Sequence, residues 1–324
     1  MSVRPAHLRY AAWAVAALVL IAAPLGLKPY GLYVLSLWAV TTIAAIGLNL
    51  TLGYAGQVSL AQAAFVGIGA YTTALLTTSG WGFTASYVLS FVLCFAVGWA
   101  LGYPALRVRH HYLAFVTLAF NTLLFLMFRN EEWLTGGIYG INRVPRPSLF
   151  GLSAAGPLVF YYFCLVNLAL IGAAAWWLVR SPWGRAFVAL RENPLRAAAL
   201  GIDTRRYTLM AFALGAGLGG LSGVLYAALL QYIDPTPFSL NLSLNLLLMV
   251  VVGGSGYFLG PFVGAAVAVL LPEWLRFVQD YYLLGYALVV LLLMAFWPTG
   301  LIGLGERLLA LRAKPLAVVD KAPP

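Results

Sequence analysis

Long apolar stretches follow one another along almost the whole chain, separated by short polar or glycine-bearing segments. Most are close to 20 residues long, the length that a helix needs to cross roughly 30 Å of hydrocarbon. They do not alternate between apolar and polar residues as barrel strands would. Ten spans are predicted, over roughly residues 10–27, 31–52, 58–79, 84–106, 112–129, 157–179, 207–231, 240–254, 259–278 and 281–297. The pattern predicts an all-α polytopic membrane protein, with residues 1–324 forming a single transmembrane domain.

Composition excludes a water-soluble protein. Hydrophobic residues make up 63% of the chain and charged residues only 9%, whereas soluble domains carry about 25% charged residues. The net charge is +10, which in a soluble protein would raise the question of nucleic-acid binding. In a membrane protein, basic residues gather in cytoplasmic loops, so no nucleic-acid partner is expected.

The distribution of basic residues predicts the orientation of the chain. If the N-terminus lies in the cytoplasm, fourteen of the 19 Lys and Arg residues fall on the cytoplasmic side. That bias predicts an even number of spans with both termini in the cytoplasm. Losing or gaining a pair of spans would leave the bias unchanged, so it does not fix the number at ten.

A polar, glycine-bearing stretch at residues 53–57 interrupts the second and third spans. It is either a surface loop or a break within the membrane. Irregular backbone at membrane depth survives only where it is buried in protein or lines a cavity, and a broken helix offers N–H groups to a passing carboxylate. The candidate substrate pathway consists of neutral polar side chains at or near this stretch and in one later span: Tyr54, Gln57, Ser59, Gln62 and Asn121. The alternative for Asn121 is a hydrogen bond between two helices.

Glycines recur in other spans. Gly215, Gly219 and Gly223 fall every fourth residue and predict a smooth helix face for close packing, a better reading than a nucleotide site because no strand precedes them. Residues 252–261 repeat the style of the first break, with an apolar run, several glycines and another apolar run. The two glycine-bearing segments suggest a pseudo-repeat with broken helices.

Two loops are long enough to have functions of their own. Residues 130–156, rich in Gly and Pro, are expected outside the cell. Residues 180–206 are basic and are expected inside, as two short helices separated at Asn193-Pro194 and closed by Gly201. Phe187 and Leu190 mark an apolar face that would dock into a groove on a partner. The alternative is an amphipathic segment resting on anionic lipid.

Several stretches, in order and spacing, resemble the LivM-type permeases of the branched-chain amino acid ABC transporter family. They cover residues 47–65, 134–140, 145–147, 183–193, 201–203, 252–261, 271–273 and 297–301. The run Ala197-Ala198-Ala199-Leu200-Gly201 is similar to the cytoplasmic loop through which such permeases contact their ATPases. This chain departs from that pattern with Arg196 in place of Glu, and with the pair His110-His111.

The resemblance implies an importer subunit for branched-chain amino acids, or related small amino acids and amides, in a bacterial-type inner membrane. Its implied partners are two cytoplasmic ATP-binding subunits, a second permease of the LivH type, a periplasmic or lipid-anchored substrate-binding protein, and membrane lipid. The residues implied to couple to the ATPases are Arg185, Arg191, Glu192, Arg196, Ala198, Gly201 and Asp203. The chain has no P-loop motif, so ATP would be hydrolysed by partner subunits. No cofactor and no metal site is expected in this chain.

Two other functions fit a polytopic protein. An ion-coupled secondary transporter of small polar solutes usually places charged residues within its spans, and here the spans are nearly free of them. A membrane enzyme would need a nucleophile or a pair of acids. Glu131-Glu132 is the only adjacent acid pair, and it lies in a loop without a neighbouring base.

Overall fold

Helices built from the apolar stretches dominate the computed structural model, which describes residues 18–105, 110–149, 152–154, 156–275, 287–288, 291 and 300–303. The longer helices are α2 (Pro29–Leu48), α3 (Gln62–Thr78), α4 (Phe83–Ala105), α5 (His110–Asn130), α7 (Pro157–Arg180), α10 (Thr204–Leu230), α11 (Leu240–Gly253) and α12 (Gly260–Leu275). The shorter ones are η1 (Ala23–Gly26), η2 (Asn49–Tyr54), α6 (Glu132–Thr135), η3 (Gly137–Tyr139), α8 (Pro182–Glu192), α9 (Pro194–Ala199) and η4 (Thr236–Phe238). The all-α prediction is confirmed.

Each predicted span between residues 31 and 278 contains one of these helices. Five helices in the described part are long and apolar enough to cross a membrane: Pro29–Tyr54, Phe83–Pro104, Leu113–Asn130, Pro157–Arg180 and Thr204–Leu230. α3 and α11 are shorter than a full crossing, with 17 and 14 residues. Residues 10–17 of the first predicted span, and all but three residues of the last one, 281–297, lie outside the described residues. A total of ten spans therefore remains a prediction.

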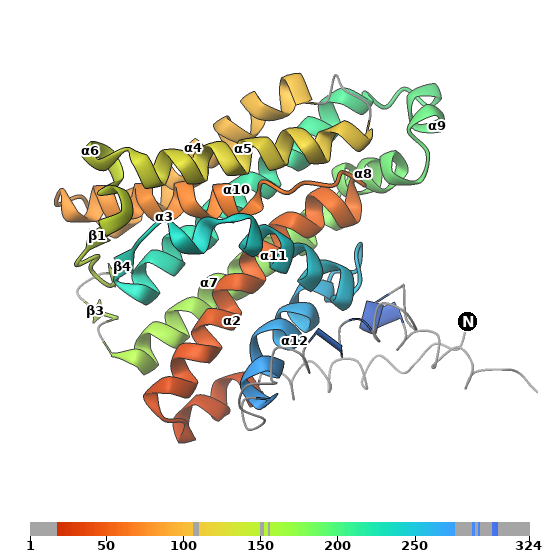
Figure 1. Cartoon of the computed structure of the whole chain (residues 1–324). Helices are drawn as coiled ribbons and strands as arrows, with labels where there is room; N and C mark the ends of the chain where they lie inside the picture. The colour runs from red at the N-terminus through yellow and green to blue at the C-terminus, as the bar shows by residue number, and fades with distance from the viewer. Residues whose placement is uncertain are drawn as a thin grey trace, which may run out of the picture.

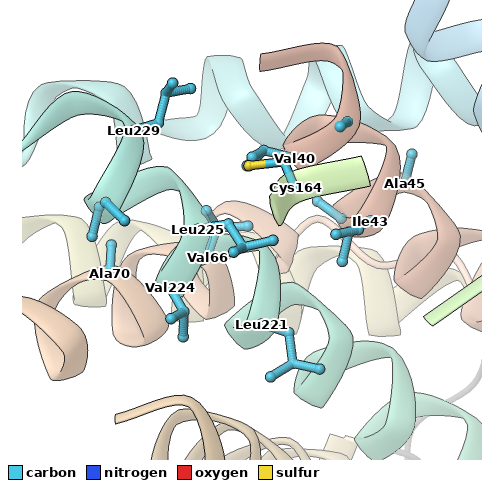
Figure 2. Close-up of a cluster of buried hydrophobic side chains, with 14 of the residues drawn as sticks. Val40, Ile43, Ala45, Val66, Ala70, Cys164, Leu221, Val224, Leu225 and Leu229 are labelled. Atoms are coloured by element: carbon cyan, nitrogen blue, oxygen red, sulfur yellow. The ribbon is translucent and has the colours of Figure 1, made fainter. Parts of the chain in front are cut away.

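α10 lies at the centre of the bundle and packs against α2, α3 and α4. Figure 2 shows aliphatic side chains of α10, including Leu221, Val224 and Leu225, in one buried cluster with side chains of α2 and α3. The predicted glycine face is confirmed. Gly215 lies against the backbone of Gly47 in α2, and Gly223 lies against the backbone of Val66 in α3.

The close approach at Gly223 makes a stability prediction. A Cβ atom added there would meet the carbonyl oxygen of Val66, which is backbone and cannot rotate away. We expect Gly223→Ala to lower the Tm of the detergent-solubilised protein by at least about 3 °C, because overpacking costs about 1–3 kcal/mol. Gly82→Ala is the control, since nothing lies within 4 Å of its added Cβ. Equal Tm values for the two variants would show that α3 and α10 separate without cost.

Short elements close the two ends of the bundle. At one end, β1 (Ile141–Asn142) pairs antiparallel with β4 (Tyr232–Ile233), and β2 (Ser148–Leu149) pairs with β3 (Leu152–Ser153). These two-residue strands were not predicted. Figure 1 shows β1, β4 and α6 gathered at one end of the long helices, and α8 and α9 at the opposite end. The predicted loop 130–156 and the predicted segment 180–206 therefore lie on opposite sides of the bundle.

Candidate functional site

The chain between α2 and α3 is a buried, non-helical segment. η2 continues α2 as far as Tyr54, a turn follows, and residues 56–61 have no helix or strand before α3 begins at Gln62. Gln57, Ser59 and Ala61 are buried. Figure 1 shows this orange segment running back alongside the bundle before α3 starts.

The contacts of Gln62 place the start of α3 well inside the bundle. Its Nε2 donates hydrogen bonds to the carbonyl oxygens of Ala44 in α2, at 3.0 Å, and of Gly215 near the middle of α10, at 3.2 Å. Roughly 15 Å of helix separates Ala44 from Tyr54, at ~1.5 Å per residue. Of the two readings of this stretch, the break inside the bundle is therefore the one found, and it covers residues 55–61. Gln62 serves mainly to tie α2 to α10.

Side chains from distant helices cap the start of α3. Thr117 and Asn121, both in α5, accept hydrogen bonds from the N–H groups of Leu60 and Ala64, at 3.0 and 2.9 Å. Ser243 in α11 accepts one from the N–H of Ala63 at 2.9 Å. The expectation that these N–H groups would be free is wrong, because an unpaired backbone donor buried away from water is costly.

A second helix begins at the same place. After β4 the chain turns back into the bundle, where the Phe238 ring is 1% exposed and packs beside the rings of Tyr71 and Phe128. α11 then starts at Leu240, and Ser243 in its first turn reaches the first turn of α3. The N-terminal ends of α3 and α11 therefore meet inside the bundle, next to α5. We call this meeting point, with Thr117, Asn121 and Ser243, the junction.

Asn121 is fully buried at the junction, and half of its amide has no partner. Its Oδ1 accepts from Ala64 N–H and, at 3.4 Å, from the Ser243 hydroxyl. Its Nδ2 makes no hydrogen bond with any described residue. Each polar side chain that caps the start of α3 is neutral. The junction therefore combines the positive ends of two helix dipoles with an unused amide donor.

The structure brings only part of the predicted pathway together. Ser59, Gln62 and Asn121 lie at or next to the junction, whereas Tyr54 belongs to a separate cluster near α8. The Nε2 of Gln57 donates to the carbonyl oxygen of Ala55, within the break itself. Thr117 and Ser243 were not among the predicted residues. Both are small hydroxyl residues in apolar runs, a pattern too common to single them out in the sequence.

The basic segment 180–206 forms two short helices, as predicted. Ser181, Asn193 and Asp203 cap α8, α9 and α10, each accepting a hydrogen bond from a backbone N–H in the first turn of its helix. Gly201 follows α9 with φ of 83°, a left-handed conformation that favours glycine. Asp203 therefore has a structural task at the start of α10.

One expectation about this segment is wrong. Phe187 and Leu190 were predicted to dock on a partner, but they are 0% and 3% exposed and pack against this chain itself. Phe187 lies in a cluster with Leu50, Tyr54 and other residues beneath η2. The exposed apolar side chains are instead Leu195 and Leu200, at 83% and 81%. Sequence periodicity showed an apolar face on α8 but not what covers it.

The remaining predicted coupling residues differ in where they point. Arg185, Glu192, Arg196 and Ala198 are exposed on α8 and α9. Arg191 is turned inward at its tip, and its guanidinium donates to the carbonyl oxygen of Gly53 at the end of η2. α8 is thus tied to η2 by a hydrogen bond from Arg191 as well as by Phe187.

The glycine-bearing segment between α11 and α12 meets η2 at the same point. Asn49 in η2 accepts from the N–H of Gly256 at 2.9 Å and donates to the carbonyl of Tyr257 at 3.0 Å. A Cβ added to Gly256 would collide with the Arg191 guanidinium. Arg191 therefore contacts both segments. That the two are related by an internal repeat stays a prediction.

Comparison with known proteins gives one family. The family model for the branched-chain amino acid transport system permease component matches residues 30–297. The high-affinity branched-chain amino acid transport system permease protein LivM of Escherichia coli (strain K12) is 33% identical over 286 residues, which covers 80% of this chain and 67% of LivM. LivM of Salmonella typhimurium is 33% identical over 297 residues, or 84% of this chain and 69% of that protein.

A second group of relatives has another substrate in its name. The autoinducer 2 import system permease protein LsrC of Escherichia coli O9:H4 is 26% identical over 250 residues, 76% of this chain and 68% of LsrC. No solved structure matches the chain.

Proposed function

Because this chain belongs to the family of branched-chain amino acid transport system permease components, we propose that it is the membrane-spanning subunit of an ABC importer for branched-chain amino acids. The observation that carries the proposal is the 33% identity to LivM over four fifths of the chain. The likeness to LsrC is weaker, at 26% identity over 76% of the chain for one relative and 31% over 52% for another, and this favours amino acids as the cargo. The family is one of multi-pass permeases of the bacterial inner membrane.

The coupling part of the proposal rests on the exposed face of α8 and α9. One of the two separate ATP-binding subunits would dock there, with Leu195 and Leu200 filling apolar pockets and Arg185 and Arg196 at the rim. ATP is bound and hydrolysed by those subunits, so this chain is not itself an enzyme and carries no cofactor. A second, LivH-like permease and a substrate-binding protein outside the membrane complete the assembly. The rest of the helical surface contacts lipid or the second permease.

The pathway part of the proposal rests on the junction. Ser59, Asn121 and Ser243 offer neutral hydrogen-bonding groups inside the bundle, where irregular backbone persists only if it is buried in protein or lines a cavity. Movement of α8 would reach this region through Arg191 and the first break. Transport then requires no covalent step in this chain, only a shift between inward-open and outward-open states.

An ion-coupled carrier is the rival that the charges disfavour. The five described helices of spanning length carry their charged residues at or beyond their ends, apart from Arg205 and Arg206 in the first turn of α10. Proton-coupled carriers usually place acidic or basic residues within their spans. Membrane-enzyme chemistry is disfavoured by Glu131, whose carboxylate accepts a hydrogen bond from the Trp133 indole on the surface.

The experiment that tests the assembly is gentle purification of the tagged chain from its native membrane, followed by mass spectrometry. We expect recovery of P-loop ATPase subunits and a second permease in stoichiometric amounts. Recovery of the chain without any ATPase, under conditions that keep another ABC importer of the same cells intact, would contradict the proposal.

The proposed orientation can be tested by labelling introduced cysteines. The native protein should give little background labelling, because both of its cysteines, Cys94 and Cys164, are buried. In spheroplasts, a membrane-impermeant maleimide should label Trp133→Cys, whose native side chain is 81% exposed at the outer end. Leu195→Cys, at the other end, should react only after the membrane is opened. The reverse pattern would place both termini and α8–α9 outside the cytoplasm.

A further inference from the structure

The unpaired donor of Asn121 singles out the junction as a binding position. The side chain is 0% exposed, and its Nδ2 has no partner among the described residues. A buried polar group without a hydrogen bond is destabilising. Its own Oδ1 is held by Ala64 N–H and the Ser243 hydroxyl. Since both atoms belong to one planar amide, the unused N–H also lies at the junction.

The surroundings define what the unused N–H would accept. α3 and α11 both start there, and each helix N-terminus carries a partial positive charge of about half an elementary charge. The capping groups, Thr117, Asn121 and Ser243, are neutral, so no side chain among them compensates that charge. An oxygen with negative charge satisfies the dipoles and the donor together.

We propose that the junction binds the carboxylate of the transported amino acid, with Asn121 Nδ2 as a donor to it; this rests on the proposed function. During passage the carboxylate displaces Asn121 Oδ1 or the Ser243 hydroxyl from the first turn of α3 and accepts from Ala63 and Ala64 N–H. α5, which carries Asn121, is packed more loosely than α10: 28% of its spanning window is buried, against 78% for α10. With so little of its surface buried, α5 can move aside more readily than α10.

The discriminating variant is Asn121→Asp. It keeps an oxygen that caps Ala64 N–H but replaces the donor by a second, negatively charged acceptor. A carboxylate ligand is repelled by this change, whereas a bound water turns its hydrogens toward the new oxygen. The complete transporter is reconstituted in proteoliposomes with ATP and loaded binding protein, and uptake of radiolabelled leucine is measured beside ATP hydrolysis.

We expect Asn121→Asp to lower leucine uptake at least about tenfold while assembly and stimulated ATP hydrolysis stay within about twofold. Asn121→Ser, which keeps a small donor, should retain uptake within about threefold, and Asn121→Leu should lose it. Thr122→Val is the matched control, since the neighbouring hydroxyl bonds only its own helix at Leu118 and is exposed.

Native-like uptake by Asn121→Asp would overturn the inference. The partner of Asn121 Nδ2 would then be a bound water molecule and not the carboxylate of the substrate. If Asn121→Asp does not assemble, equal uptake by Asn121→Ser and Asn121→Leu would overturn it instead. Failure of the proposed function is distinguishable, because then the unaltered transporter itself takes up no leucine with ATP.

Discussion

Replacing Arg191 by alanine should separate ATP hydrolysis from transport. The Arg191 guanidinium donates to the Gly53 carbonyl at the end of η2 and lies against Gly256 in the segment between α11 and α12. Among the described side chains of α8, that of Arg191 reaches both η2 and the segment between α11 and α12. Without it, α8 keeps its apolar contacts with η2, chiefly through Phe187.

We expect Arg191→Ala to lower the number of leucine molecules moved per ATP at least about tenfold. A hydrogen bond from a charged donor contributes about 1.5–3 kcal/mol, enough for a ten- to hundredfold shift in a conformational equilibrium. Assembly and ATP hydrolysis should remain within about threefold of the native values. Uptake and phosphate release are measured in the same proteoliposomes.

Arg185→Ala is the control for this prediction. Arg185 lies on the same helix, carries the same charge and is exposed, with a single long hydrogen bond of 3.5 Å to the carbonyl of Arg180. Its removal should leave transport per ATP within about twofold, because an exposed charge at the rim of an interface contributes little. If the two variants behaved alike, Arg191 would act only as one positive charge among several on the surface of α8.

The second large effect is expected from Leu195→Glu combined with Leu200→Glu. Both leucines are more than four fifths exposed at α9, where water solvates them poorly in the isolated chain. Burying each against a partner would contribute about 1.5–3 kcal/mol, and a buried, unpaired glutamate would reverse that gain.

Recovery of the ATPase subunits with the double variant should fall to about a twentieth of the native recovery or less. The permease itself should remain folded, because neither side chain packs in its core. Ile138→Glu, 57% exposed at the opposite end, should leave ATPase recovery unchanged. Full recovery with the double variant would assign the docking face to another surface, and α9 would then be a lipid contact.

Local signals in the sequence were sufficient for the helices and their ends. Runs of apolar residues predicted the spans from 31 to 278. Pro182 begins α8, Asn193 separates α8 from α9, and Gly201 follows the end of α9 in a left-handed conformation. The glycine face of α10 was predictable because a four-residue spacing places the three glycines on one side of a helix.

Contacts between residues far apart in the chain could not be predicted from the sequence. Ser243 caps an amide 180 residues away, and Thr117 one 57 residues away, and nothing local to either hydroxyl specifies that partner. Phe187 was expected to face another protein because an amphipathic pattern says how wide an apolar face is, not whether the same chain covers it. The inward direction of Arg191 was hidden for the same reason, because the sequence does not distinguish it from the exposed Arg185 and Arg196.

The most direct test of the central claim is leucine uptake by proteoliposomes that contain this chain with its co-purified subunits and binding protein. We expect uptake that requires enclosed ATP, stops with a non-hydrolysable ATP analogue and continues after ionophores collapse the proton and sodium gradients. Uptake that persists without ATP and stops with the ionophores would contradict it and identify an ion-coupled carrier.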